Sequence, residues 1–249
     1  MPEPSDPESS TVGGRACFEA SPASKRIGAR EPVYAISVGE APHWFIAVRG
    51  EPGALTPGVT ERWRSSTDFT MIGGAPDEAY WQHFIIAVGG DEAEAPLALD
   101  GAEDAYVARI KLQRPPVLIF GVLRTLIALG ILTKPHGPIV QDAQALSFRA
   151  DVMPSAASIA RLLAQPPRYA PAMVNFLGYY KTAQYRNAQH AVSGRAAYMR
   201  YGVVAMRTVY RTGGHLLFTA RVLSVLREPK SGPTVGHWDD LAAMRYPNP

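Results

Sequence analysis

The stretch YWQHFIIAV, residues 80–88, is rich in aromatic and β-branched residues and ends at two glycines. Such a composition between turn-forming residues is typical of a β-strand. Four further runs of this kind occur, at 33–38, 44–48, 68–72 and 105–112. A Gly- and Pro-containing loop separates the second run from the third, and the acidic segment 89–104 follows the quoted stretch. We therefore expect an antiparallel sheet within residues 32–113, with the acidic loop exposed.

The second half of the chain mixes helical and strand-like segments. The almost wholly apolar run 117–132 follows two prolines and predicts a buried helix. Its length and Arg124 argue against a membrane span, so we expect no stable membrane insertion. Further helices are expected at 155–165, opened by Ser155, and at 171–190, opened by Pro171. Residues 196–209 and 215–227 have the composition of strands. The fold class predicted is therefore α+β.

Length and composition indicate one globular domain. The chain has 249 residues, of which 47% are hydrophobic and 19% charged, enough to form one core. Residues 1–14 are rich in Pro, Ser and acidic residues and predict a disordered arm before a single domain at 15–249. The arm has no apolar or basic leader pattern, so the expected location is the cytoplasm. Cys17 is the single cysteine, which excludes an internal disulfide and a cysteine-rich zinc site.

The charge is distributed unevenly along the chain. Residues 1–110 contain 8 Lys and Arg against 17 Asp and Glu, whereas residues 111–249 contain 17 against 5. The second half is therefore suited to an anion, which leaves nucleic acid, a lipid surface and a small anionic ligand open. No nucleic-acid recognition motif accompanies the charge, so a nucleic-acid partner is not expected.

One group of polar residues in the second half could carry chemistry. On a helix at 171–190, Tyr179, Thr182 and Arg186 are spaced i, i+3 and i+7 and would share one face. A tyrosine phenolate can be an axial ligand of haem iron, and a nearby guanidinium can pair with a propionate. The alternative is that these tyrosines are ordinary core or rim residues with bonded hydroxyls.

Three stretches resemble known haem proteins. Residues 179–186 (YYKTAQYR) are similar to the Tyr-x-Asp-Thr-x-x-(Tyr/His)-Arg haem-ligand motif of catalases. Residues 45–53 (FIAVRGEPG) with 67–71 (TDFTM), and residues 233–240 (PTVGHWDD), resemble motifs of the small bacterial catalase-related proteins. The resemblance implies a catalase-like antiparallel β-barrel-type sheet with packed helices. It also implies haem b as cofactor, with Tyr179 as the iron ligand and Arg186, Thr182 and Asn175 as cofactor-binding residues.

The chain also departs from the catalase pattern. The distal His has no counterpart, and the distal Asn is replaced within Gly73-Gly74-Ala75-Pro76. Asn175 stands where an Arg normally neutralises the phenolate, and Lys181 replaces the motif's Asp. Without the distal acid–base pair, peroxide disproportionation loses help worth about 10²- to 10⁴-fold.

The resemblance, together with the missing distal residues, leaves two expected functions. The first is a divergent haem-dependent peroxidase or oxygen-transfer enzyme acting on peroxide or a small organic substrate, with weak or no catalase activity. Its catalytic residues are unknown. The alternative is a haem-free or inactive catalase-like subunit that serves binding or assembly in a homo- or hetero-oligomer.

Overall fold

The computed structural model describes residues 16–21, 41–72, 79–113, 118, 121–122, 125–126, 129–131, 154–167, 169–183 and 192–246. Its centre is one antiparallel sheet. The strands are β1 (Ala16–Ser21), β2 (His43–Gly50), β3 (Val59–Ser66), β4 (Phe69–Ile72), β5 (His83–Gly89), β6 (Ala102–Gln113), β7 (Ala172–Leu177), β8 (His215–Arg227) and β9 (Asp240–Arg245). They lie in the order β3-β5-β2-β6-β8-β9-β7-β1-β4. Every strand pair is antiparallel, as the sequence predicts for the first half.

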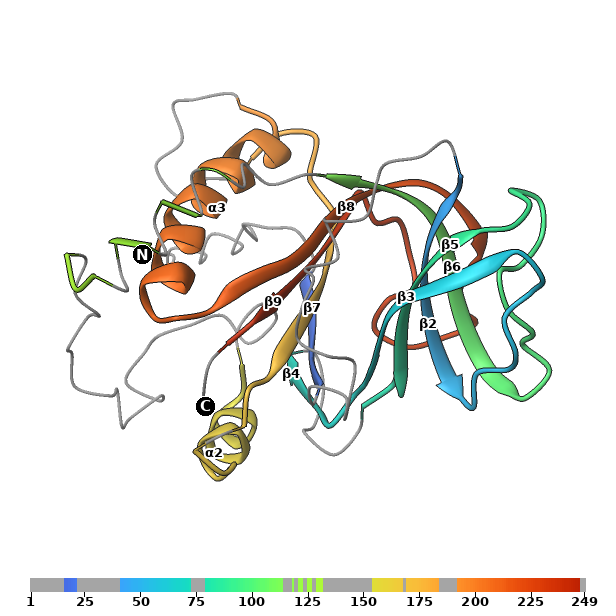
Figure 1. The fold of residues 1–249 in the computed structure, drawn as a ribbon, viewed down its shortest axis with the longest axis horizontal. Coiled ribbons are helices and arrows are strands. Elements are labelled where there is room, and N and C mark those ends of the chain that lie inside the picture. The colour runs from blue at the N-terminus through green and yellow to red at the C-terminus, as the bar shows by residue number, and fades with distance from the viewer. Residues whose placement is uncertain are drawn as a thin grey trace, which may run out of the picture.

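The sheet curls back on itself, as Figure 1 shows. Its two edge strands, β3 and β4, are consecutive in the chain and separated by only Thr67 and Asp68. The end of one edge therefore lies next to the start of the other, because two residues span only about 7 Å. The sheet forms a curled half-barrel, which confirms the predicted antiparallel sheet. The described part of the chain is mostly β, with helices packed beside the sheet.

Aromatic side chains fill the inside of the curl. The inner cluster draws residues from β2, β5, β6, β7, β8 and β9, and includes Phe45, Phe84, Tyr106, Phe176, Phe218 and Trp238. Phe176 lies at its centre, with its ring centroid 5.4 Å from Phe45 and 5.7 Å from Tyr106. These rings meet edge to face, an arrangement that adds to the burial energy.

The outer face of β2, β5 and β6 is also buried. Trp44, Ile46 and Val48 alternate with the inward residues of β2 and form a second cluster with residues of β5 and β6. The loops that the sequence predicts at 50–58 and 89–104 cover this face through Leu55 and Leu97, which form an isolated bridge. The acidic residues Asp91, Glu92, Glu94, Asp100 and Glu103 are exposed, as predicted, whereas Leu97 and Asp104 are buried.

Two helices lie against the sheet. The helix α2 (Ala156–Leu163) begins where the sequence predicts, because the Ser155 hydroxyl accepts a hydrogen bond from the Ser158 amide. The helix α3 (Gly194–Arg211) is capped in the same way by Ser193. In Figure 1, α3 lies at the upper left of the sheet and α2 below it.

Two secondary-structure predictions in the second half are wrong. The expected helix 171–190 is strand β7 over Ala172–Leu177, followed by a non-helical segment to residue 183. Pairing with β1 and β9 on both sides outweighs the helix signal of Pro171. Conversely, the expected strand 196–209 belongs to α3, because Ser193 caps a run of Ala, Arg and Met whose helix propensity exceeds the opposing effect of its valines. The predictions for β2, β4, β5, β6 and β8 are confirmed to within three residues.

The predicted burial of the helix 117–132 is wrong at the positions that the structure describes. Residues 118, 121–122 and 125–126 are helical, yet Leu118 is 83% exposed and Leu129 67% exposed. The aromatic side chains of the strands already fill the inner face of the sheet, so the helical residues of this segment do not pack in that core. Within the described part of the chain, no helix is long and apolar enough to cross a membrane. The predictions for 1–14 and 33–38 lie outside the described residues.

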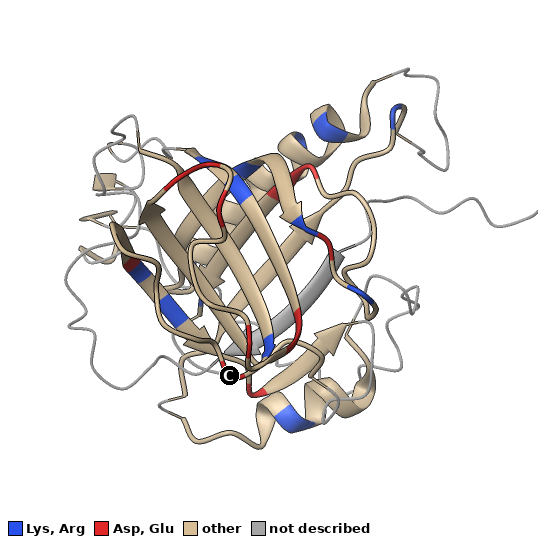
Figure 2. Cartoon of the chain, turned by 90° about the vertical axis from the view of Figure 1, so that its right-hand side faces the viewer, with Lys and Arg blue, Asp and Glu red and all other residues tan. Residues whose placement is uncertain are grey.

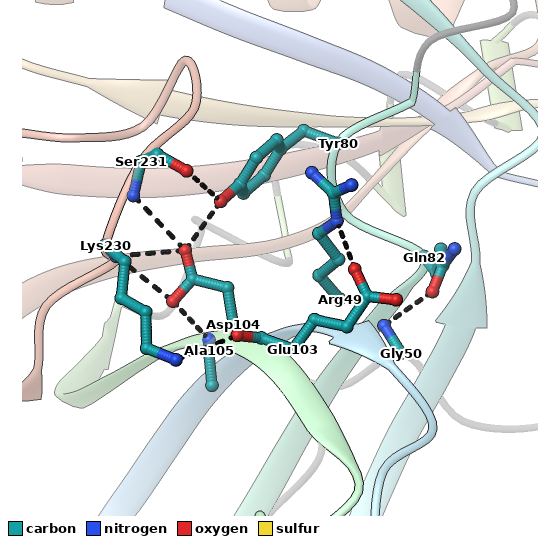
Figure 3. A network of polar contacts seen from close by, with 9 residues as sticks. All are labelled: Arg49, Gly50, Tyr80, Gln82, Glu103, Asp104, Ala105, Lys230 and Ser231. Atoms are coloured by element: carbon teal, nitrogen blue, oxygen red, sulfur yellow. Dashed lines mark hydrogen bonds and ion pairs between the residues drawn. The ribbon is translucent and has the colours of Figure 1, made fainter.

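A buried carboxylate joins β6 to the segment after β8 (Figure 3). The Asp104 carboxylate accepts hydrogen bonds from the Tyr80 hydroxyl at 2.6 Å and from the backbone amides of Ala105, Lys230 and Ser231. The Arg49 guanidinium lies 4.8 Å from the centroid of the Tyr80 ring. Every polar group of Asp104 is therefore bonded, and the network holds the segment 228–231 against the sheet.

Candidate ligand-binding site

A cavity of about 720 Å³ lies between α3, α2 and the outer face of β7 and β9. The two strands divide their residues between core and cavity by simple alternation. On β7, Val174 and Phe176 enter the inner cluster, whereas Met173 lines the cavity. On β9, Leu241 and Ala243 point inward and Met244, which pairs with Met173, lines the cavity.

The described lining of the cavity is almost entirely apolar. It contains Met71, Pro154, Leu162, Pro171, Met173, Tyr198, Tyr201, Gly202, Val204, Ala205, Met206, Thr208, Val209, Thr212, Met244 and Tyr246. No charged side chain occurs among these residues. Methionine is flexible and polarisable, so a lining with four methionines can adapt to ligands of different shape. A cavity of this size and polarity is typical of sites for apolar small molecules.

Three tyrosines supply the main polar groups of the cavity. No described residue forms a hydrogen bond with the hydroxyl of Tyr198, Tyr201 or Tyr246. Burial, followed by the neighbouring phenols Tyr201 and Tyr246, raises the pKa of Tyr198 to about 12. Burial also raises the pKa of Tyr246. These two phenols therefore stay protonated at neutral pH and can donate hydrogen bonds to a ligand oxygen.

A polar cluster lies beside the cavity at the end of β7. The Tyr179 hydroxyl donates to Oδ2 of Asp240 at 3.1 Å, and the Arg195 guanidinium donates to the same oxygen at 3.2 Å. The Tyr179 amide donates to Asp239 at 2.8 Å. The Tyr179 ring packs on Tyr198, with centroids 5.5 Å apart. This cluster fixes the start of α3 against β9 and separates Tyr179 from the cavity by one ring.

The predicted haem ligand is not placed as an iron ligand in this arrangement. Burial, with the adjacent Asp240 carboxylate, raises the pKa of Tyr179 well above its usual range, which opposes phenolate formation. Its hydroxyl is bonded to Asp240, and Tyr179 is not among the described lining residues. The residues around Tyr179 therefore do not fit a haem in this conformation. Haem binding itself stays a prediction.

The other predicted cofactor residues lie apart from one another. Asn175 is buried on β7, where its side-chain amide donates to the Ala242 carbonyl at 3.4 Å. It shares the strand face of Met173, two residues away, and its Oδ1 has no hydrogen-bond partner among the described residues. Thr182 is exposed in the segment after β7. Arg186 lies outside the described residues. The shared helical face predicted for Tyr179 and Thr182 does not exist, because neither residue is in a helix.

Comparison with known proteins identifies no relative. No protein-family model, curated protein or solved structure matches the chain.

The sequence reasoning missed this cavity. Its lining residues come from β4, α2, β7, α3 and β9, which the chain brings together only through folding. The available signal was the spacing within α3, where Tyr198, Tyr201 and Ala205 follow a helical period. The strand-like composition of 196–209 predicts a strand instead, in which these three residues would not share one face.

Proposed function

We propose that this protein binds an apolar small molecule that bears a hydrogen-bond acceptor, such as a carboxylate or carbonyl group. The cavity between α3 and the sheet carries the proposal, because it combines an apolar, methionine-rich lining with phenols that lack partners among the described residues. A ligand would bury its apolar body against Met173, Met206 and Met244. Its acceptor would meet the protonated phenol of Tyr198.

Substitution at Gly202 tests this proposal. Gly202 lies in α3 and lines the cavity, and a Cβ atom built there meets no atom within 4 Å. Gly202→Trp therefore fills the cavity without a clash at its first side-chain atom. We expect it to reduce the affinity for an apolar fluorophore such as phenylnaphthylamine at least tenfold, measured by fluorescence titration with oleate as competitor.

The matched control is Gly202→Ala, which leaves the cavity open. It should bind the fluorophore like the wild type while stabilising α3, since alanine favours a helix over glycine by about 1 kcal/mol. Equal binding by the tryptophan variant and the wild type would place the fluorophore elsewhere and contradict the proposal. Melting temperatures of all three proteins show whether the fold is intact.

A catalase-like haem protein is the second candidate, and it is carried by the resemblance of residues 179–186 to the catalase motif. The proximity of the Tyr179 ring to the cavity-lining Tyr198 supports it. When bound, haem would supply the redox chemistry of a peroxidase. Binding through Tyr179 requires this phenol to leave Asp240, so the candidate implies a rearrangement of the polar cluster.

Haemin titration tests this second candidate. If Tyr179 is the ligand, Tyr179→Phe should abolish the high-spin tyrosinate absorption spectrum while circular dichroism shows that the fold is intact. Tyr180→Phe is the matched control, because Tyr180 is adjacent and exposed. Spectra that are identical in the wild type and the Tyr179 variant would exclude Tyr179 as ligand.

A further inference from the structure

The outward face of α3 exposes apolar and basic side chains together. We call this face the α3 surface and define it by Met199, Arg200, Tyr201, Val203, Val204 and Arg207. Val203 is 72% exposed, Val204 65% and Tyr201 63%. Three neighbouring large side chains exposed on one helix are unusual on a protein surface that contacts only water.

The helices α2 and α3 carry charged residues of one sign only. No aspartate or glutamate occurs between Asp151 and Glu228 in the sequence. In Figure 2, both helices carry blue segments and no red ones. Arg195 is paired with Asp240, whereas Arg200 and Arg207 form no ion pair with any described residue. The α3 surface therefore presents, beside exposed valines, two guanidinium groups that have no acidic partner among the described residues.

A second exposed apolar face occurs between β6 and α2. Leu118 and Val122 are helical and spaced i and i+4, which places them on one side of the helix, and both are exposed, as is Leu129 in the turn that follows. Thr125 lies on the same side, and its hydroxyl donates to the Gly121 carbonyl. The described part of the chain thus exposes apolar side chains on α3 and on this helical segment.

We propose that the α3 surface docks on an anionic lipid membrane and that the cavity takes its ligand from that membrane. Helices with exposed apolar and arginine side chains bind the lipid–water interface, where apolar groups enter the acyl boundary and arginines pair with phosphates. Tyr201 and Val204 belong both to the α3 surface and to the cavity lining, so the cavity opens at this surface. The transfer of the ligand, unlike the docking, rests on the proposed function.

Charge favours a lipid partner over a second copy of this chain. A symmetric dimer formed through the α3 surface would place Arg200 and Arg207 against the same arginines of the other copy, with no acidic residue of α3 to compensate them. Like charges at an interface disfavour association. An anionic lipid surface instead supplies the opposite charge together with an apolar layer.

Vesicle sedimentation tests the docking. The full chain should bind vesicles of phosphatidylcholine and phosphatidylglycerol in equal parts, and bind pure phosphatidylcholine vesicles much more weakly. Each arginine near an anionic surface contributes about fivefold to partitioning, so the double variant Arg200→Gln, Arg207→Gln should bind about thirtyfold more weakly. Raising the salt to about 1 M should weaken wild-type binding, because the screening length falls to about 3 Å.

Two control variants are needed. One tests whether any arginine on the surface contributes to vesicle binding, and the other tests whether vesicle binding depends on the cavity. Arg62→Gln removes an exposed arginine on β3 and should bind anionic vesicles like the wild type. Gly202→Trp should also bind them like the wild type, since vesicle binding does not need an open cavity. If Gly202→Trp loses fluorophore binding but keeps vesicle binding, the substitution affects the cavity and not the docking.

Three results would overturn the docking. The first is equal binding to neutral and anionic vesicles, or binding to neither. The second is a dimer in sedimentation velocity that Val203→Glu converts to a monomer, since the α3 surface would then be an interface between copies. The third is duplex DNA binding that falls in the double arginine variant without any vesicle binding.

Discussion

Replacing Phe176 with alanine is expected to destabilise the fold by about 3–5 kcal/mol, enough to remove much of the stability of a single domain. Phe176 is 1% exposed and contacts the rings of Phe45, Tyr106 and Trp238. It joins β7 to strands on the far side of the curl, so its removal leaves a cavity that no single neighbour can fill. Urea unfolding followed by tryptophan fluorescence measures the loss.

Two controls separate cavity formation from general sensitivity to substitution. Phe176→Leu keeps most of the buried volume and should cost clearly less than the alanine variant. Leu163→Ala removes a large apolar side chain that is 51% exposed at the end of α2, and should cost much less than Phe176→Ala. A loss below about 1 kcal/mol for Phe176→Ala would contradict the assignment of the inner cluster as the core that holds the curled sheet together.

The second large effect is expected at Asp104. Asp104→Ala removes a carboxylate that is 2% exposed and leaves the Tyr80 hydroxyl and several backbone amides without their acceptor. Unpaired buried donors cost about 1–3 kcal/mol each, so we expect a total loss of roughly 3 kcal/mol. Tyr80→Phe removes one donor and its hydrogen bond to Asp104 but leaves the other donors paired, so it should lower the free energy of unfolding by only about 1 kcal/mol. A loss for Asp104→Ala no larger than that for Tyr80→Phe would contradict the role of the network.

The same carboxylate predicts a dependence of stability on pH. Burial alone would raise the pKa of Asp104, but hydrogen bonds from Tyr80, Lys230 and Ala105 outweigh it and hold the pKa below its ordinary value of 3.8. A depressed folded-state pKa means that the carboxylate stabilises the fold above the unfolded-state pKa and loses this effect as the pH falls through the folded-state pKa. The free energy of unfolding should therefore fall below pH 3.8 in the wild type, and this part of the fall should be smaller in Asp104→Asn.

The sheet could be predicted from the sequence where strands are buried on both faces. The segments around Phe45, Phe84 and Val107 are continuous apolar runs between turns, and a run of that length has few alternatives to a buried strand. The segment 172–177 is short and follows Pro171, a residue that favours the start of a helix, so the local signal predicts a helix there. Its pairing with β1 and β9, which lie far away in the sequence, decides its structure.

The candidate site was less accessible to sequence reasoning than the sheet. The interest in Tyr179 came from a helical spacing that the fold does not have, although the residue does lie one ring away from the cavity. Met71, Met173 and Met244 belong to three different strands, and only the curl of the sheet under the two helices brings them together. No local sequence pattern identifies these methionines as cavity residues, because each one taken alone looks like an ordinary apolar residue of a strand.

The measurement that tests the central claim most directly is methionine-methyl NMR of the full chain titrated with oleate below its aggregation concentration. Four methionines line the cavity, namely Met71, Met173, Met206 and Met244, whereas Met199 is exposed on α3 outside it. We predict that oleate shifts the methyl signals of these four residues more than that of Met199, which belongs to the α3 surface, and that Gly202→Trp abolishes the shifts of the four. If the four signals stay fixed at saturating oleate, the cavity between α3 and the sheet is not a ligand-binding site.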